Sequence, residues 1–258
     1  MGVRAIFLSD AHLKGPGDAA YPKLIRFFDR LQGRGDEGGR SISADALAVD
    51  LLVIAGDFFD FWFGRGDAVN PGFQPVIDKI VALKQQGVRI CLCEGNHDFF
   101  LGDYFTERLG IEVYPEWAEF DIDGLRVFVS HGDTVDRSNR KYLALRRFLR
   151  SRFAFALQRL IPLKLLWRLA SLSSEMSKKI SGTPDCHLAE IMHRFALGKF
   201  QEGYDAVILG HCHKPTLLDA LYDGRRKTFA MPGDWIANDS YISYHDGRFA
   251  LNRFLPEE

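Results

Sequence analysis

The sequence predicts an α/β fold in which a largely parallel sheet carries helices on its faces. Five short runs rich in aliphatic and aromatic residues end abruptly in glycine or polar residues, at 3–9, 50–56, 88–95, 125–132 and 205–210. Runs of this length are typical of buried strands. Apolar residues at helical spacing separate the first three runs. Such alternation of strands and helices favours parallel strands with helices packed against them.

Two helices and two hairpins complete the expected body. The helices are indicated by two sets of apolar residues at helical spacing, namely Leu24, Phe27, Phe28 and Leu31, and then Val76, Ile77, Ile80 and Val81 before Gly87. Beyond residue 215, short strand-like runs surround Asp223-Gly224 and Asp246-Gly247. Such dipeptides are typical of tight hairpin turns, so we expect an antiparallel region there.

Residues 139–200 interrupt the strand series, and we expect them to form a helical cap insertion within a single domain of residues 1–258. An apolar stripe at helical spacing runs along the first part and ends at Pro162. Twelve basic residues and one acidic residue lie between Arg137 and Lys179. Two interpretations remain open: helices packed on the body with a solvated basic face, or a lid for a ligand that is both apolar and anionic. The charges exclude a transmembrane span.

The composition is that of an ordinary soluble globular protein. The 258 residues include 33 Lys and Arg against 34 Asp and Glu, and 47% are hydrophobic. The four cysteines form no C-x-x-C pair, and the N-terminal run MGVRAIFLSD has no signal-peptide pattern. We therefore expect a cytoplasmic protein, with buried Cys91 and Cys93 in its core.

Histidines and carboxylates gather just beyond the predicted strands. The five groups are Asp10 and His12, then Asp57 and Asp60, then Asn96, His97 and Asp98, then His131 and Asp133, and finally His211 and His213. Because the carboxyl ends of parallel strands line one crevice, we expect these side chains to converge. Convergent imidazole, carboxylate and amide groups are typical of metal ligands.

This donor set suits two divalent ions such as Mn²⁺, Fe²⁺ or Zn²⁺. Two cations held about 4 Å apart need an anionic ligand between them, and we assign that place to Asp57. Such a pair activates water and holds the oxygens of an in-line phosphoryl displacement. Hydrolysis of a phosphate ester or anhydride is therefore the expected reaction. Asp60 and Asp133 are candidates for orienting the ligand imidazoles, and Cys212 is expected to point away from them.

The five motifs, in this order, resemble those of the calcineurin-like metallophosphoesterases over most of residues 5–215. The resemblance implies a four-layer double β-sandwich flanked by helices, with one metal held by Asp10, His12, Asp57 and His213. It implies a second metal held by Asp57, Asn96, His131 and His211, with manganese the first expectation. It also implies that His97, oriented by Asp98, contacts the scissile phosphate or protonates the leaving group.

Within that family the chain looks most like the UDP-2,3-diacylglucosamine diphosphatases of lipid A biosynthesis. The similar features are Gly56-Asp57-Phe58-Phe59-Asp60 followed by Trp62, Asn96-x-Asp98-Phe99 followed by Leu101-Gly102, His131-Gly132-Asp133-Thr134, and the helical insertion. The resemblance implies cleavage of a pyrophosphate to UMP and a lipid-linked sugar 1-phosphate under a basic, apolar cap. It implies substrate contacts from Asn96, His97, Asp136, Asn139, Lys178 and His211, and a possible peripheral contact of the cap with the inner membrane.

Two other hypotheses stand beside this one. Those diphosphatases typically carry Arg where this chain has His97, which favours as an alternative a phosphodiesterase for a nucleotide or another small phosphorylated substrate. A binding scaffold that has kept the fold without the chemistry is the third. No nucleic-acid partner is expected, because the basic segment offers few aromatic stacking residues.

Overall fold

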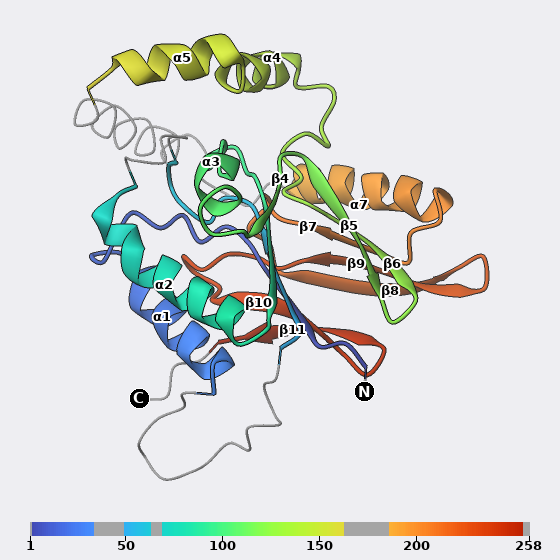
Figure 1. Ribbon diagram of the computed structural model, residues 1–258. Helices are drawn as coiled ribbons and strands as arrows, with labels where there is room; N and C mark the ends of the chain where they lie inside the picture. Colours follow the sequence, from blue (N-terminus) through green and yellow to red (C-terminus); the bar gives the residue numbers. More distant parts are fainter. Residues whose placement is uncertain (1, 34–48, 63–68, 163–185, 255–258) are drawn as a thin grey trace.

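Two β-sheets stacked face to face form the body of the protein, with helices on both outer faces (Figure 1). The computed structural model describes residues 2–33, 49–62, 69–162 and 186–254. All five predicted strand runs form strands, and both predicted hairpins are present within these residues.

The first sheet combines four parallel strands with one antiparallel hairpin. Its strand order is β11 (Arg248–Arg253), β10 (Ser240–His245), β1 (Ala5–Leu8), β2 (Leu51–Ala55), β3 (Arg89–Cys93) and β4 (Glu112–Tyr114). Strands β1 to β4 run parallel, while β10 is antiparallel to β1 and to β11. The carboxyl ends of β1, β2 and β3 therefore share one edge.

The second sheet is also mixed, and its existence corrects the expectation, drawn from the strand pattern, of one largely parallel sheet. Its strand order is β5 (Trp117–Ile122), β6 (Leu125–Ser130), β7 (Ala206–Leu209), β9 (Arg225–Met231) and β8 (Thr216–Tyr222). Strands β6, β7 and β9 run parallel, with β5 and β8 antiparallel at the edges. A fully buried run has the same composition in either sheet, so the strand pattern alone did not divide the strands between two sheets.

Alternation along the strands produces the four layers. Ile6 and Leu8 pack outward against the helices, whereas Ala5 and Phe7 pack inward among residues of both sheets. This is the period of two that a strand imposes on its side chains. Cys91 and Cys93 belong to the core between the sheets, as predicted. The four-layer double sandwich expected from the family resemblance is thus confirmed.

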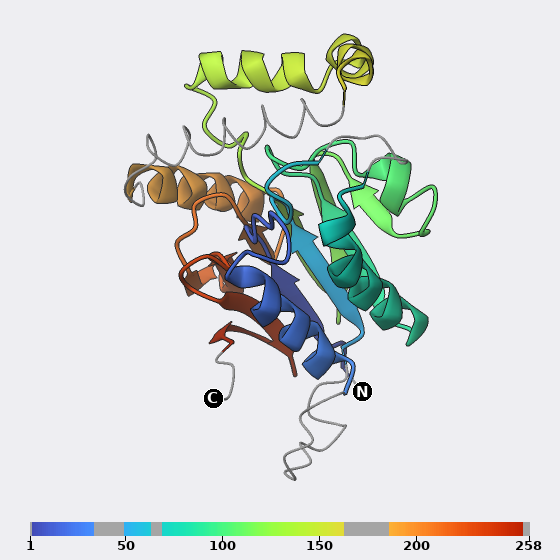
Figure 2. The same cartoon turned by 90° about the vertical axis from the view of Figure 1, so that its left-hand side faces the viewer.

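Helices cover each outer face. The first sheet carries α1 (Ala20–Leu31) and α2 (Gln74–Gln85), the latter preceded by a single 3₁₀ turn, η2 (Pro71–Phe73), with the short α3 (Gly102–Phe105) nearby. The second sheet carries α7 (Cys186–Gln201), which packs Met192, Ala196 and Phe200 against it. Both helices predicted from the apolar spacing are confirmed, and Figure 2 shows α1 and α2 side by side.

Two further helices stand above the sandwich in both views (Figures 1 and 2). They are α4 (Arg140–Leu149) and α5 (Arg152–Leu160), and their first turns are capped by the side chains of Asn139 and Ser151. Both fall in the segment predicted to be helical. No helix among the described residues has the length and hydropathy needed to cross a bilayer.

Candidate metal centre

The expected metal ligands follow strands of both sheets and meet where those strands end. Asp10 and His12 follow β1, Asp57 follows β2, Asn96 follows β3, His131 follows β6, and His211 and His213 follow β7. The expected ligands form two clusters, one of Asp10, His12 and His213 and one of Asp57, His131 and His211, and a third group of candidate donors joins Asp60 and His97 to His12. In each cluster the donor atoms lie within 4.8 Å of one another. The structure therefore brings together side chains up to about 200 positions apart in the sequence.

Much of this site is built on left-handed backbone. The φ angles are 54° at Asp10, 45° at His12, 50° at Asp57, 66° at His211 and 55° at His213. A residue with a β-carbon in this region costs about 1–2 kcal/mol, and such strain clusters at functional sites. The turns aim successive side chains into the space between the loops. The surrounding fold therefore supports a geometry that the local chain does not favour.

The first cluster has the donor spacing of a shared ion. His213 Nε2 lies 3.3 Å from His12 Nε2 and 3.3 Å from Asp10 Oδ1. Donors about 2.1 Å from a common tetrahedral ion stand about 3.4 Å apart. Two imidazole nitrogens facing each other at this distance are therefore well placed to bind one cation. Asp10 Oδ1 is buried and has no hydrogen-bond partner within the described part of the chain, which also suits a cation at this position.

The second cluster is joined to the first through one oxygen of Asp57. Asp57 Oδ2 lies 3.4 Å from His131 Nε2 and 3.6 Å from His12 Nε2. Asn96 extends the second cluster, because its Oδ1 lies 3.1 Å from His131 Nε2. A carboxylate oxygen that faces both clusters has the position expected of a bridging ligand. When two divalent ions are bound, they supply an activated water and neutralise charge on the phosphoryl oxygens.

Electrostatics within the site favour a negative Asp57. Burial opposes ionisation of this carboxyl, but His131 and His97 hold its pKa well below the usual value. Burial also opposes a charge on His131, yet Asp57 raises the pKa of His131 to about 10. Burial and the neighbouring His131 lower the pKa of His211 to about 4. Near pH 7 Asp57 is therefore anionic and His211 is a neutral imidazole, both of which suit metal binding, whereas His131 would have to release its proton when a metal binds.

Three of the ligand imidazoles, those of His12, His131 and His213, have an oxygen near their second nitrogen. His131 Nδ1 donates to Ala55 O at 3.1 Å, which leaves Nε2 to face the site. His12 Nδ1 lies 3.6 Å from Asp60 Oδ1, consistent with the predicted orienting role of Asp60. His213 Nδ1 lies 3.6 Å from Asp234 Oδ2. The sequence reasoning did not identify Asp234, which follows Pro232-Gly233 in the loop after β9.

Asp98 has a role that differs from the expected one. Its carboxylate accepts the backbone N–H groups of Asp57, Phe58, Phe59 and Gly95 at 2.7–3.1 Å. Burial, followed by the charge of Asp57, raises the pKa of Asp98 to about 7. The assignment of Asp98 as the residue that orients His97 is corrected: it holds the loops after β2 and β3 together.

The His97 ring is held instead by a backbone oxygen. Its Nδ1 lies 3.0 Å from Asp60 O, and a carbonyl only accepts, so this nitrogen carries the proton. The His97 backbone N–H donates to Asp57 Oδ1 at 2.9 Å. His97 also packs edge-on against His12, with ring centroids 4.8 Å apart. His97 is therefore fixed beside both metal clusters.

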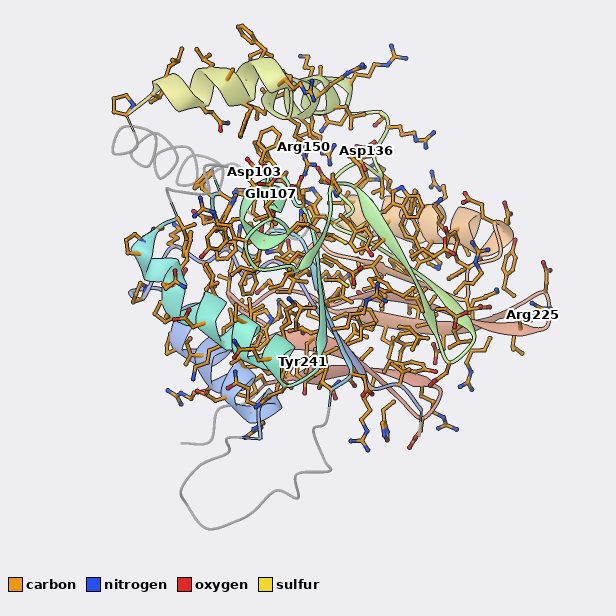
Figure 3. The ribbon with its side chains drawn as sticks, viewed as in Figure 1. Asp103, Glu107, Asp136, Arg150, Arg225 and Tyr241 are labelled. Atoms are coloured by element: carbon orange, nitrogen blue, oxygen red, sulfur yellow. The ribbon has the colours of Figure 1, made fainter. Side chains whose placement is uncertain are left out.

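Arg146 and Arg150, counted among the cationic groups of the expected cap, are in fact paired with the body. Arg146 Nε lies 2.5 Å from Asp133 Oδ2, and that oxygen also accepts the Tyr142 hydroxyl at 2.8 Å. Arg150 donates to Gly95 O and Pro115 O, both at 2.7 Å, and to Glu94 at 3.0 Å. Figure 3 shows Arg150 directly below α4. Asp133 thus anchors α4, where the sequence suggested an imidazole partner.

The remaining predicted substrate contacts lie around the start of α4. Asp136 accepts the Ser138 hydroxyl at 2.6 Å, and Asn139 caps the helix by accepting the Tyr142 N–H at 3.2 Å. Lys178 lies outside the described residues. Cys212 is buried in the core beneath α7, so its side chain points away from the site, as predicted.

A bridged pair of metal clusters of this kind serves to bind and polarise a phosphoryl group, and the protein is a metal-dependent phosphoester hydrolase. Comparison with known families makes the assignment more specific. The chain belongs to the calcineurin-like phosphoesterase family, whose model matches residues 3–215.

Relatives match over nearly the whole chain. The chain is similar to the UDP-2,3-diacylglucosamine hydrolase of Aeromonas salmonicida, with 29% identity over 97% of this chain and 94% of the relative. It is similar to that of Pseudomonas savastanoi, with 28% identity over 98% of this chain and 97% of the relative. Among solved structures, an archaeal phosphodiesterase matches at 15% identity and a TM-score of 0.47, covering 97% of this chain and 99% of its own.

Proposed function

We propose that the protein hydrolyses the pyrophosphate of UDP-2,3-diacylglucosamine to UMP and 2,3-diacylglucosamine 1-phosphate, a step of lipid A biosynthesis. The observation that carries this proposal is an exposed apolar face on α4 and α5 beside the metal centre. Phe153 is 67% exposed and Leu160 is 80% exposed, although both belong to the apolar stripe of an amphipathic segment. An acylated substrate would cover such a face. The names of the relatives support the same substrate.

The helix pair touches the loop that carries the catalytic candidates. The ring of Phe155 on α5 packs against the ring of Phe100, with the ring centroids 4.7 Å apart. Phe100 is three residues beyond His97. Phe100 has a φ of 61°, a rare conformation for a bulky residue. Arg150 binds Gly95 O, on the other side of Asn96 and His97 in the chain. Acyl chains lying on α5 would therefore place the pyrophosphate beside His97.

We assign as the cap the part of the predicted segment 139–200 that precedes α7, because α7 packs on the second sheet, and we assign Mn²⁺ as the metal at both positions. Asn96, His97 and His211 would contact the phosphates, and Asp136, Asn139 and Lys178 would contact the sugar. The substrate is a lipid, so we place the protein in the cytoplasm at the inner face of the inner membrane. Arg140, Lys141, Arg147 and Arg152 are exposed and could contact anionic headgroups.

The test is Mn²⁺-supported hydrolysis of UDP-2,3-diacylglucosamine, with the products identified by mass. Release of UMP and the lipid monophosphate is expected for the wild type and not for Asp57→Ala. Arg225→Ala, at the tip of the β8–β9 hairpin (Figure 3), serves as the control for substitution of an exposed residue. No turnover of the lipid, with the same preparation cleaving bis(p-nitrophenyl) phosphate, would remove the substrate assignment and leave the phosphoesterase.

A second candidate is a phosphodiesterase for a nucleotide or another small phosphorylated substrate. The position of His97 favours it, because Asp60 O accepts from Nδ1, and the protonated ring could then donate the proton of Nε2 to a leaving group. Turnover of cyclic nucleotides or dinucleotides without turnover of the lipid would support this function.

A further inference from the structure

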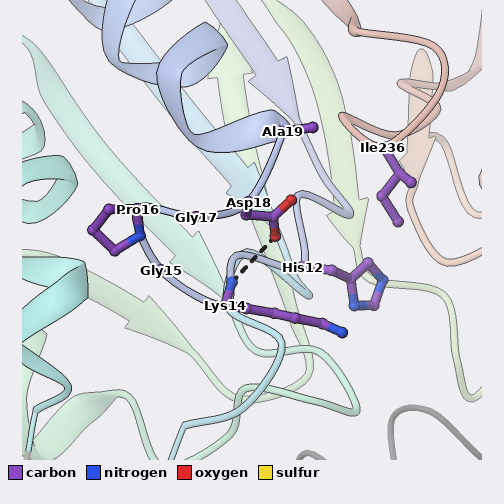
Figure 4. A pocket seen from close by; sticks show the side chains of 8 residues that line it. All are labelled: His12, Lys14, Gly15, Pro16, Gly17, Asp18, Ala19 and Ile236. Atoms are coloured by element: carbon purple, nitrogen blue, oxygen red, sulfur yellow. Dashed lines mark hydrogen bonds between the residues drawn. The ribbon is translucent and has the colours of Figure 1, made fainter.

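A polar cavity opens directly beside the first metal cluster. Its volume is about 490 Å³, and His12 forms part of its wall. Lys14, Asp18 and Ile236 line it together with backbone of the loop before α1 (Figure 4). This volume lies in the range of small-ligand sites. A ligand in the cavity would reach the metal centre past the His12 ring.

The lining offers three kinds of contact. Lys14 contributes an ammonium whose ion pair with Asp60 is 3.9 Å long, beyond hydrogen-bond distance, and whose side chain is 44% exposed. Asp18 contributes a carboxylate that accepts the Lys14 backbone N–H at 3.3 Å and so braces the loop. Ile236, 47% exposed, contributes an apolar side chain. Figure 4 shows these groups around one hollow.

The loop itself leaves room for a ligand. A β-carbon placed at Gly15 or at Gly17 would meet no atom within 4 Å, so open space faces both residues. Pro16, between them, adds a rigid apolar ring to the lining. A cation, a carboxylate and apolar walls are the partners that a phosphate, a ribose and a base require, respectively.

The cavity and the helix pair occupy different ends of the metal centre. The cavity adjoins His12, in the first cluster. Helix α4 is tied to Gly95 and Asp133, which neighbour Asn96 and His131 of the second cluster. A diphosphate that joins a polar group to an apolar group could therefore place the polar group in the cavity and the apolar group on the helix pair.

We propose that this cavity binds the nucleoside monophosphate arm of the substrate. This inference rests on the proposed function and specifies how the substrate lies across the site. Lys14 binds the phosphate of that arm, Asp18 accepts from the ribose hydroxyls, and Ile236 packs against the base. The acylated sugar then extends toward α4 and α5.

The test compares binding of UMP and of inorganic phosphate to the Mn²⁺-loaded protein by calorimetry. Gly17→Leu places a bulky side chain at a lining position that is not a metal ligand, and we expect it to weaken UMP binding at least tenfold while phosphate binding stays within twofold. Lys14→Ala is expected to weaken UMP binding about tenfold. The matched control, Arg225→Ala, removes an exposed cation from the distant hairpin and should change neither affinity.

Three results would overturn the proposal. One is wild-type binding of UMP that is no tighter than that of phosphate. Another is a UMP affinity that neither Gly17→Leu nor Lys14→Ala changes. The last is an equal loss of both ligands in Gly17→Leu. A wrong substrate assignment would be recognised separately. The wild type would then not turn over the lipid substrate, whereas the UMP affinities could still be measured and compared. If the wild type turns over the lipid substrate but the cavity substitutions leave the UMP affinity unchanged, only the proposed role of the cavity is rejected.

Discussion

Substitution of Arg150 should lower the stability of the protein, because it leaves the buried carboxylate of Glu94 without its cationic partner. Its side chain is 11% exposed and its guanidinium donates to three oxygens, while the side chain of its partner Glu94 is 7% exposed. Burial raises the pKa of Glu94, and Arg150 opposes that shift. Arg150→Ala leaves a buried carboxylate unpaired, a change that costs about 3–5 kcal/mol. In a chain of this size that corresponds to a fall in Tm of roughly 6–20 °C.

A double-mutant cycle separates this electrostatic effect from lost packing. Glu94→Gln removes the carboxylate charge, so Arg150→Ala should cost at least about 1.5 kcal/mol less in that background. Urea denaturation of the four variants measures the coupling. Arg147→Ala is the matched control, because Arg147 lies on the same helix and is exposed; its change should stay within about 0.5 kcal/mol.

The same substitution should reach the metal centre. Arg150 binds Gly95 O, and Asn96 is the next residue, so we expect weaker Mn²⁺ binding in Arg150→Ala by about tenfold. Equal costs of Arg150→Ala in both backgrounds would refute the paired-charge argument. Wild-type metal affinity would show that α4 does not support the loop after β3.

Three further predictions concern aspartates of the centre. Asp57→Asn removes the charge that faces both clusters, so both metal ions should be lost in elemental analysis and diester turnover should fall by about 10³-fold or more; two retained ions would contradict the bridging role. Asp98→Asn sets an amide NH₂ against backbone N–H groups, so urea denaturation should show a loss of about 3 kcal/mol; a loss below about 1 kcal/mol is incompatible with the contacts described. Asp234→Asn should weaken metal binding 10- to 100-fold and also lower stability, because the new amide NH₂ would face the Asn238 amide NH₂ that now donates to Asp234 Oδ2; an unchanged metal affinity would mean that His213 is oriented by other groups.

The metal clusters could be predicted because their signal is local. Each motif sits directly after a strand, and the end of a strand fixes where the next side chains lie. His12 and His213 are far apart in the sequence, yet both follow parallel strands whose carboxyl ends meet. Strands of both sheets therefore bring the residues at their carboxyl ends to one site.

The division into two sheets has no such local signal. Phe7 and Leu8 are equally apolar, although one faces the other sheet and the other faces a helix. The sequence reasoning also missed β5, despite its alternation of exposed and buried residues from Trp117 to Ile122. That alternation could have indicated an edge strand with one solvated face.

Partners distant in sequence were the hardest to predict. Asp234 is 21 positions from His213, and nothing in the sequence pairs them. Arg146 and Arg150 belong to a strongly basic run, and such runs are ordinarily solvated. Asp133 and Glu94 lie beside these arginines only in the folded protein. Both arginine side chains are therefore mostly covered, although the sequence pattern is typical of exposed cations.

Helix α4 is attached to the body by charge rather than by its apolar stripe. A surface helix is ordinarily stabilised by burying its apolar face, but none of the α4 residues is buried. Leu145 and Phe148 remain more than half exposed, while Arg146 and Arg150 are mostly covered. Polar anchoring therefore leaves the apolar stripe available to a ligand. Had the stripe packed on the sandwich, α4 would gain stability but offer no surface to an acyl chain.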